Sequence, residues 1–236
     1  MYNFQDNRLR PDLASYLLDY EYMENVPFFA NTPDGTHCVQ ASFRIILKYF
    51  LPEHDFSYEQ LDAMSQKQPG KGTWWPALLL ELSKLGIEVI DIEPFDYERF
   101  YKEGEAYVRS FYPEGVAKYH LKSTNLNDIK SLIPEFLQKV DIQSRPAKTD
   151  DIERLLNDGW LVAAALNSRT LNDRPGFSGH VVVVYKADKH SGQLWLHDPG
   201  LPPHQNLLVT RQKFEEAFYY AGQGNAAIVG LKQAAN

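Results

Sequence analysis

The stretch PDGTHCVQASFRIILKYF, residues 33–50, joins a turn to an amphipathic helix. The Pro-Asp-Gly sequence at its start is typical of a tight turn. Beyond the turn, apolar residues recur with the spacing of one helix face, at Val39, Phe43, Ile46, Leu47 and Phe50. This pattern predicts a helix from about Cys38 to Phe50. Cys38 stands in its first turn, about 100° around the helix from Val39 and outside the apolar stripe.

Cys38 is the only cysteine in the chain, so no intramolecular disulfide can form and a reducing compartment is expected. A lone cysteine can be a small hydrophobic core residue. A thiol in the first turn of a helix, however, lies beside unpaired N–H groups and the positive end of the helix dipole, and both lower its pKa. The position of Cys38 favours a nucleophile, and the core alternative stays open.

The rest of the chain is rich in helices first and in strands later. Residues 12–24 fit a short helix, and residues 96–140 are mostly helical. Another helix follows Gly72, with Thr73 as its N-cap, and ends before Gly86. Residues 87–92, 160–166, 180–185 and 193–197 fit strands. This order predicts an α+β fold.

A second group of candidate residues lies on a predicted β-hairpin. His180 precedes four valines that are apolar on both faces of a strand, which predicts a central strand. If Tyr185 pairs with Gln193 across the turn at 187–192, His180 falls opposite Asp198, close enough for contact. A carboxylate there could fix the tautomer and orientation of the imidazole. The alternative for His180 is a strand-end histidine bonded to the backbone.

Composition excludes several classes of function. A net charge of −7 without a run of Lys or Arg argues against a nucleic-acid partner. The longest apolar run, residues 160–166, is far shorter than the about 20 residues of a membrane span. The first 25 residues are acidic and lack the apolar core of a signal peptide, so a soluble cytoplasmic protein is expected. No cofactor motif is present, and the histidines near the hairpin match no zinc-binding spacing, so no metal is expected.

Four segments together resemble the papain-like cysteine peptidase superfamily, in particular its bacteriocin-leader-processing (double-glycine) peptidase-like group. They are residues 37–50, the Gly-Thr-Trp-Trp-Pro segment at 72–76, the strand at 179–184 and the His-Asp-Pro-Gly corner at 197–200. The resemblance covers roughly residues 26–92 and 155–220. It implies a papain-like fold in which a helical half carrying Cys38 packs on an antiparallel sheet carrying His180 and Asp198. The chain is then a single domain, residues 1–236, with an N-terminal extension at 1–30 and a helical insertion at 93–154.

The resemblance also implies an activity. Cys38, His180 and Asp198 would form a Cys-His-Asp triad that hydrolyses a peptide or amide bond through an acyl-enzyme. One alternative is a thiol acyltransferase that uses the same triad on an acyl substrate. The other is a catalytically silent papain-like module that binds peptides.

The sequence departs from the family pattern near the cysteine. Members usually carry a Gln about six residues before the cysteine, whose amide helps to hold the oxyanion. Here that position is Thr32, and Asn31, one residue further back, has the amide that could replace it. The usual Gly-Pro after the cysteine is Val39-Gln40. Trp74 and Trp75 either line a substrate groove or belong to the core.

Overall fold

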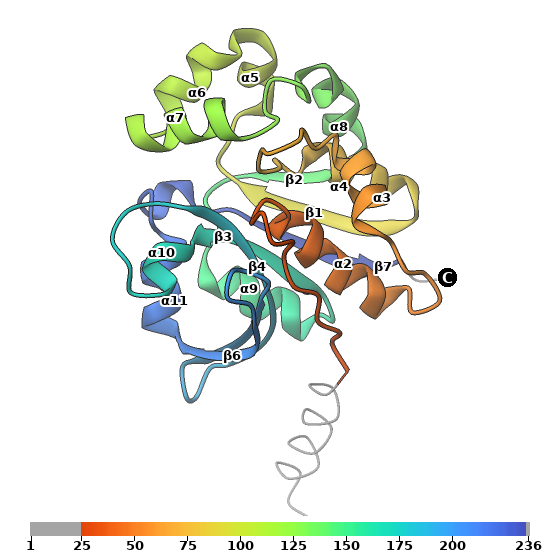
Figure 1. Cartoon of the computed structure of the whole chain (residues 1–236), viewed down its shortest axis with the longest axis vertical. Helices are drawn as coiled ribbons and strands as arrows, with labels where there is room; N and C mark the ends of the chain where they lie inside the picture. Colours follow the sequence, from red (N-terminus) through yellow and green to blue (C-terminus); the bar gives the residue numbers. More distant parts are fainter. Residues whose placement is uncertain (1–24, 235–236) are drawn as a thin grey trace, which may run out of the picture.

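The computed structural model describes residues 25–234, which form a single seven-stranded β-sheet with helices on both faces (Figure 1). The strands are β1 (Ile87–Glu93), β2 (Asp141–Ser144), β3 (Leu161–Asn167), β4 (Gly179–Asp188), β5 (Gln193–Asp198), β6 (His204–Thr210) and β7 (Ile228–Gln233). The helices are α2 (Cys38–Phe50), α3 (Tyr58–Ser65), α4 (Pro76–Lys84), α5 (Tyr97–Glu103), α6 (Glu105–Phe111), α7 (Glu114–Ser123), α8 (Ile133–Lys139), α9 (Thr149–Asn157), α10 (Ser168–Leu171) and α11 (Arg211–Phe218).

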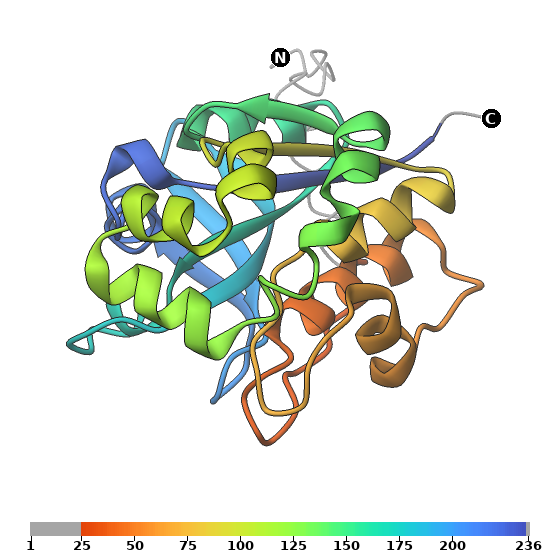
Figure 2. The ribbon, with the colours of Figure 1, turned by 90° about the horizontal axis from the view of Figure 1, so that it is seen from above.

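The sheet has the strand order β2-β1-β7-β3-β4-β5-β6. Only the β1–β2 pair is parallel, and all other neighbours are antiparallel. The last strand, β7, lies between β1 and β3 and so joins the helix-rich first half to the strand-rich second half (Figure 2). The sequence-based prediction of an α+β fold is confirmed.

The central position of β4 explains its run of valines. Val181 and Val183 pack into the core beneath α2 and α4, whereas Val182 and Val184 pack into the core beneath α9 and α11. Successive side chains of a strand point to opposite faces, so a strand covered on both sides needs apolar residues at every position. The prediction of a central strand from this run is confirmed.

The helix expected from the opening stretch spans Cys38–Phe50 as predicted. The next predicted helix starts later than expected, because Pro76 occupies the first helical position of α4 and Trp75 is the N-cap. The prediction of Thr73 as the cap was therefore wrong. Its hydroxyl instead accepts a hydrogen bond from Gln40 Nε2 at 2.8 Å, which ties the loop before α4 to α2.

The segment 93–154, which the sequence predicted to be a helical insertion, contributes more than helices. It forms α5 to α8, but also the edge strand β2 and most of α9, which covers the second face of the sheet. The helix predicted at 12–24 and most of the predicted extension 1–30 lie outside the described residues.

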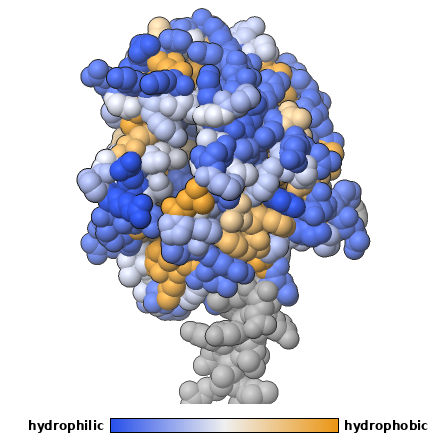
Figure 3. Space-filling model, viewed as in Figure 1, coloured by the Kyte–Doolittle hydropathy of each residue, from blue (hydrophilic) through white to orange (hydrophobic). Residues whose placement is uncertain are grey.

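The surface is mainly hydrophilic on the face shown in Figure 3, with small separate apolar areas. Within residues 25–234, no helix combines the length and the apolar character needed to cross a membrane.

Candidate active site

Cys38 lies at the N-terminus of α2, against the beginning of β4. Ser42, one turn further along α2, donates a hydrogen bond from its hydroxyl to the carbonyl oxygen of Val181 at 3.1 Å. This bond fixes the helix face that carries Cys38 against the strand end that carries His180. The Cys38 thiol and the His180 imidazole lie close enough to shift each other's pKa. Cys38 remains partly exposed, as a reactive thiol must be.

His180 also contacts Asp198, with 2.5 Å between Nε2 and Oδ1. Both side chains are buried, with 6% and 2% of their surface exposed, so water screens this interaction little. Since Nε2 is bonded to Asp198, Nδ1 is the ring nitrogen left for Cys38. The structure therefore brings together the three residues that the sequence singled out.

The hairpin pairing that led to Asp198 was wrong in detail. Gln193 pairs with Asp188 rather than with Tyr185, because the turn is shorter than predicted. A β-bulge between Val184 and Lys186 then shifts the register, and Val183 pairs with His197. Asp198 is thus a diagonal neighbour of His180 rather than a directly opposite one. Diagonal neighbours lie about 7–8 Å apart at Cα, a gap that an imidazole and a carboxylate can bridge together.

The corner after Asp198 holds the carboxylate in place. The backbone N–H of Gly200 donates to Asp198 Oδ1 at 2.8 Å. A Cβ atom at Gly200 would lie 2.8 Å from that oxygen and 3.2 Å from His180 Nε2, so only glycine fits here without a shift. Pro199 accepts a hydrogen bond from the Asn31 N–H at 2.7 Å, which joins this corner to the loop before α2.

The charges of these groups favour an ion pair. Burial alone raises the pKa of the Cys38 thiol, but the hydrogen bond and positive charge of His180 and the N–H groups of Val181 and Val39 lower it below its ordinary value. Burial opposes protonation of His180, yet its bonds to Asp198 and Cys38 raise its pKa to about 10. The same contact with His180 outweighs burial and lowers the pKa of Asp198. These shifts favour a thiolate beside an imidazolium.

Asn31 borders a cleft that His180 also lines. Its Oδ1 accepts a hydrogen bond from the His37 N–H at 2.8 Å, and this partner identifies the oxygen because an amide NH₂ cannot accept. The NH₂ group of Asn31 is therefore directed away from His37. Asn31 lines a polar cleft together with His180, Asp198 and Gly200.

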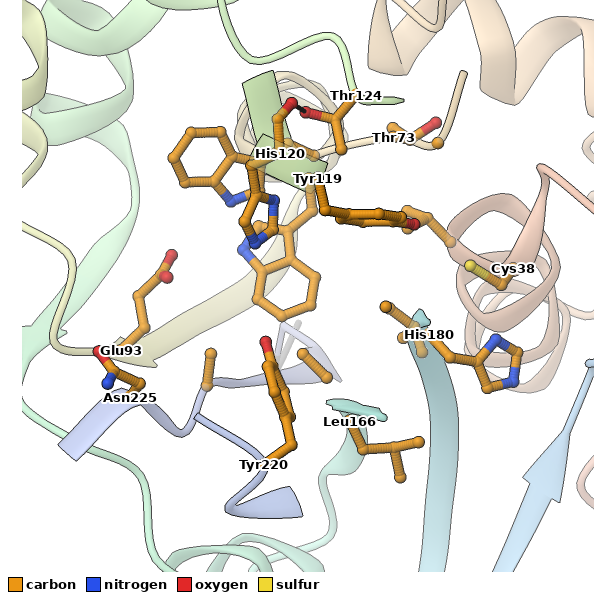
Figure 4. A pocket seen from close by; sticks show the side chains of 18 of the residues that line it. Cys38, Thr73, Glu93, Tyr119, His120, Thr124, Leu166, His180, Tyr220 and Asn225 are labelled. Atoms are coloured by element: carbon orange, nitrogen blue, oxygen red, sulfur yellow. Dashed lines mark hydrogen bonds between the residues drawn. The ribbon is translucent and has the colours of Figure 1, made fainter. Parts of the chain in front are cut away.

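A second cavity begins at Cys38 and His180 and extends between the sheet and the helices of the first half (Figure 4). Trp74 and Trp75 both line it and are only 7% and 4% exposed. Trp74 also packs edge-on against Phe95, at 4.6 Å between ring centroids. The two alternatives for this pair are thus not exclusive, since both residues belong to the core and to the cavity wall.

Sequence reasoning did not identify Tyr119, whose ring borders the cavity near Cys38 (Figure 4). It comes from α7, within a segment for which the sequence indicated helices but no site. Gly179 makes room for it, because a Cβ atom there would lie 3.0 Å from the Tyr119 ring. Sequence reasoning also did not identify Gln40 as a residue that positions others. It donates to Ser65 and Thr73, which border the loop leading to Trp74.

Among the described residues, no group of three or more His, Cys, Asp or Glu side chains is arranged to hold a metal ion. No family model matches the sequence, and no curated protein matches it.

The fold, with α2 packed on a mainly antiparallel sheet, is similar to that of a solved C39-like structure. A solved structure with this fold is a protein from Bacillus anthracis, described as a "putative C39-like peptidase". It superposes with a TM-score of 0.52 and covers 91% of this chain and 98% of its own. The two sequences are 14% identical, so the likeness shows a shared fold.

Proposed function

We propose that this protein is a cysteine hydrolase that cleaves a peptide or amide bond, with Cys38 as nucleophile, His180 as general acid and base, and Asp198 as the residue that orients His180. One observation carries the proposal: His180 lies beside the Cys38 thiol and contacts the Asp198 carboxylate at the same time. The fold shared with a C39-like peptidase supports it.

The reaction follows from the protonation states. The Cys38 thiolate attacks the carbonyl carbon, and the carbonyl oxygen becomes an oxyanion. His180 donates its proton to the leaving nitrogen, the C–N bond breaks, and a thioester on Cys38 remains. Water then attacks the thioester while His180 accepts a proton from it, which releases the acid and restores the ion pair.

Two donors are proposed for the oxyanion. The Cys38 N–H belongs to the first helical residue of α2, where backbone N–H groups lack intrahelical partners. The Asn31 NH₂ is directed away from His37, whose N–H occupies its oxygen. Loss of one such donor typically lowers turnover about 100- to 1,000-fold, so Asn31→Ala should do so if Asn31 fills this role.

We further propose a peptide substrate that crosses His180 from one cavity to the other. The polar cleft with Asn31 and the aromatic cavity with Trp74 and Trp75 meet at this residue, which lines both. The resemblance of residues 37–50 to double-glycine peptidases makes a Gly-Gly sequence before the cleaved bond the first one to assay. A reducing, cytoplasmic location suits a chain whose single cysteine acts as a thiolate.

The test is labelling with a peptide that carries a thiol-reactive group. Because Cys38 is the only cysteine, intact mass reports its modification without ambiguity. The wild-type protein should be labelled rapidly at pH 6, and His180→Ala only slowly, whereas Cys38→Ala should not be labelled. Labelling that requires denaturant would make Cys38 a structural residue and would favour the catalytically silent peptide-binding module.

Product analysis separates hydrolysis from acyl transfer. A peptide substrate should yield a free acid when water is the only acceptor, and the same acid in the presence of amines or thiols. If the acyl group instead appears on an added amine or thiol at concentrations far below that of water, the protein is an acyltransferase with the same triad.

A further inference from the structure

The cavity that begins at Cys38 ends at a buried pair of acids. Asp91 and Glu93 are alternate residues of β1 and therefore point to the same side of the sheet, toward the first-half helices. They are 0% and 2% exposed, and Tyr97 donates its hydroxyl to both. Glu93 lines the cavity, at the end opposite to Cys38 and His180 (Figure 4).

This end of the cavity carries no positive charge of its own. None of the residues that line it is a lysine or arginine. Within residues 25–234, neither Asp91 nor Glu93 forms an ion pair. A buried carboxylate without a cationic partner is costly, so acids in the core of a protein are ordinarily paired. Such a pair either keeps a proton or is neutralised by a cation from outside the described chain.

The polar atoms at this end include several acceptors, beside the indole N–H of Trp75. Both ring nitrogens of His120 are sealed from solvent without a hydrogen-bond partner. Burial lowers the pKa of His120 to about 4, so the ring stays neutral and one nitrogen is an acceptor. Asn225 donates its NH₂ to the carbonyl oxygen of Ala221 at 2.7 Å, which leaves Oδ1 as its remaining polar atom. The hydroxyl end of Tyr220 projects into the middle of the cavity (Figure 4).

The walls between the two ends are aromatic. Trp74, Tyr112, Tyr119 and Tyr220 all line the cavity. The faces of such rings attract ammonium and guanidinium groups, most strongly where water is excluded. An aromatic channel that starts at the nucleophile and ends at a buried carboxylate fits a long side chain with a positive charge at its tip.

We propose that this cavity is a specificity pocket that receives a lysine or arginine side chain of the substrate and binds its charged end at Glu93. The inference rests on the proposed function, because it places the rest of the substrate across Cys38. Lysine and arginine combine a flexible apolar stem with a head that only donates hydrogen bonds, which matches the aromatic walls and the acceptors.

The ionisation of Glu93 is consistent with such a ligand. Burial raises its pKa to about 7, against hydrogen bonds from Tyr97, Asp91 and Trp75 that lower it. Burial and the neighbouring Glu93 raise the pKa of Asp91 well above its ordinary value, which favours a proton on the pair. A ligand cation beside Glu93 would favour its carboxylate form.

The experiment compares peptides that differ at one position by a charge. Each position around the cleaved bond is occupied in turn by lysine or its neutral analogue norleucine, and by arginine or its neutral analogue citrulline. At one position the charged member should have a kcat/KM about 10- to 100-fold higher, as expected for one charge-assisted hydrogen bond in a buried site. Glu93→Gln should abolish this preference. Glu88 is an exposed glutamate on the same strand, so the control Glu88→Gln should retain the charge preference.

The outcomes separate the two proposals. Cys38-dependent cleavage without a charge preference, or with a preference that survives in Glu93→Gln, overturns this inference and leaves the hydrolase intact. Absence of Cys38-dependent cleavage for every peptide refutes the hydrolase. The pocket is then judged by binding alone, with calorimetric titration of hexylammonium and hexanol. Tighter binding of hexylammonium that Glu93→Gln abolishes supports the pocket, whereas equal binding or none overturns it.

Discussion

Replacing Asp198 tests the site most directly, because Asn and Ala remove different parts of its interaction with His180. Oδ1 of Asp198 accepts both from His180 Nε2 at 2.5 Å and from the Gly200 N–H at 2.8 Å. An asparagine can place its own oxygen there and keep both hydrogen bonds. Asp198→Asn therefore removes the charge and little else, whereas Asp198→Ala removes the charge and both bonds.

The magnitudes follow from the burial of the pair. A hydrogen bond with a charged partner contributes about 1.5–3 kcal/mol and a neutral one about 0.5–1.5 kcal/mol. The difference of about 1–2 kcal/mol makes the ion pair roughly 5- to 30-fold less populated in Asp198→Asn. In Asp198→Ala a buried imidazolium loses its partner, at about 3–5 kcal/mol. That is enough to return Cys38 to an ordinary thiol, of which about 0.3% is thiolate at pH 6.

The assay is the rate of alkylation of Cys38 by iodoacetamide between pH 5 and 9, which needs no substrate. At pH 6 the rate should fall moderately in Asp198→Asn and to that of a free thiol in Asp198→Ala. Asp188, which only accepts N–H and hydroxyl groups in the hairpin turn, supplies matched Asn and Ala controls that should alkylate normally. If both Asp198 variants alkylate like the wild type and only their melting temperatures fall, the carboxylate merely stabilises the corner.

Three further predictions concern the same site. Gly200→Ala adds a Cβ that would crowd Asp198 and His180. It should lower the alkylation rate and lower the free energy of unfolding in urea by about 1–3 kcal/mol. An unchanged alkylation rate and an unchanged free energy of unfolding would contradict this close packing. Ser42→Ala should lower the free energy of unfolding by about 1 kcal/mol and slow alkylation, because it loosens α2 from β4. The control Ser83→Ala removes a hydrogen bond within α4 and should leave alkylation unchanged. Because the pKa of His180 is raised, its positive charge stabilises the fold. This contribution is complete below the ordinary pKa of 6.5 and is lost as the pH rises through about 10. His180→Ala should lack this alkaline loss in pH-dependent melting, and an identical profile in both proteins would show that His180 is not protonated at neutral pH.

Local patterns in the sequence were enough to predict the elements that carry the site. The apolar spacing in residues 33–50 predicted the bounds of α2 and the position of Cys38 at its start. The valine run predicted a central β4, since a strand covered on both faces reads as a near-continuous apolar run. Such features depend on neighbours within one turn or one strand, and the order of the residues determines them.

The contacts between elements needed the tertiary structure. The meeting of His180 and Asp198 was predicted from a register that proved wrong, because the turn is shorter than predicted and a bulge in β4 shifts the pairing again. The burial of Asp91 and Glu93 was equally hidden. Residues 90–93 alternate between apolar and acidic, as in a strand with one solvated face, but α4 and Tyr97 of α5 cover that face. Sequence periodicity specifies which face of an element is apolar, whereas only the packed chain determines what lies against the other face.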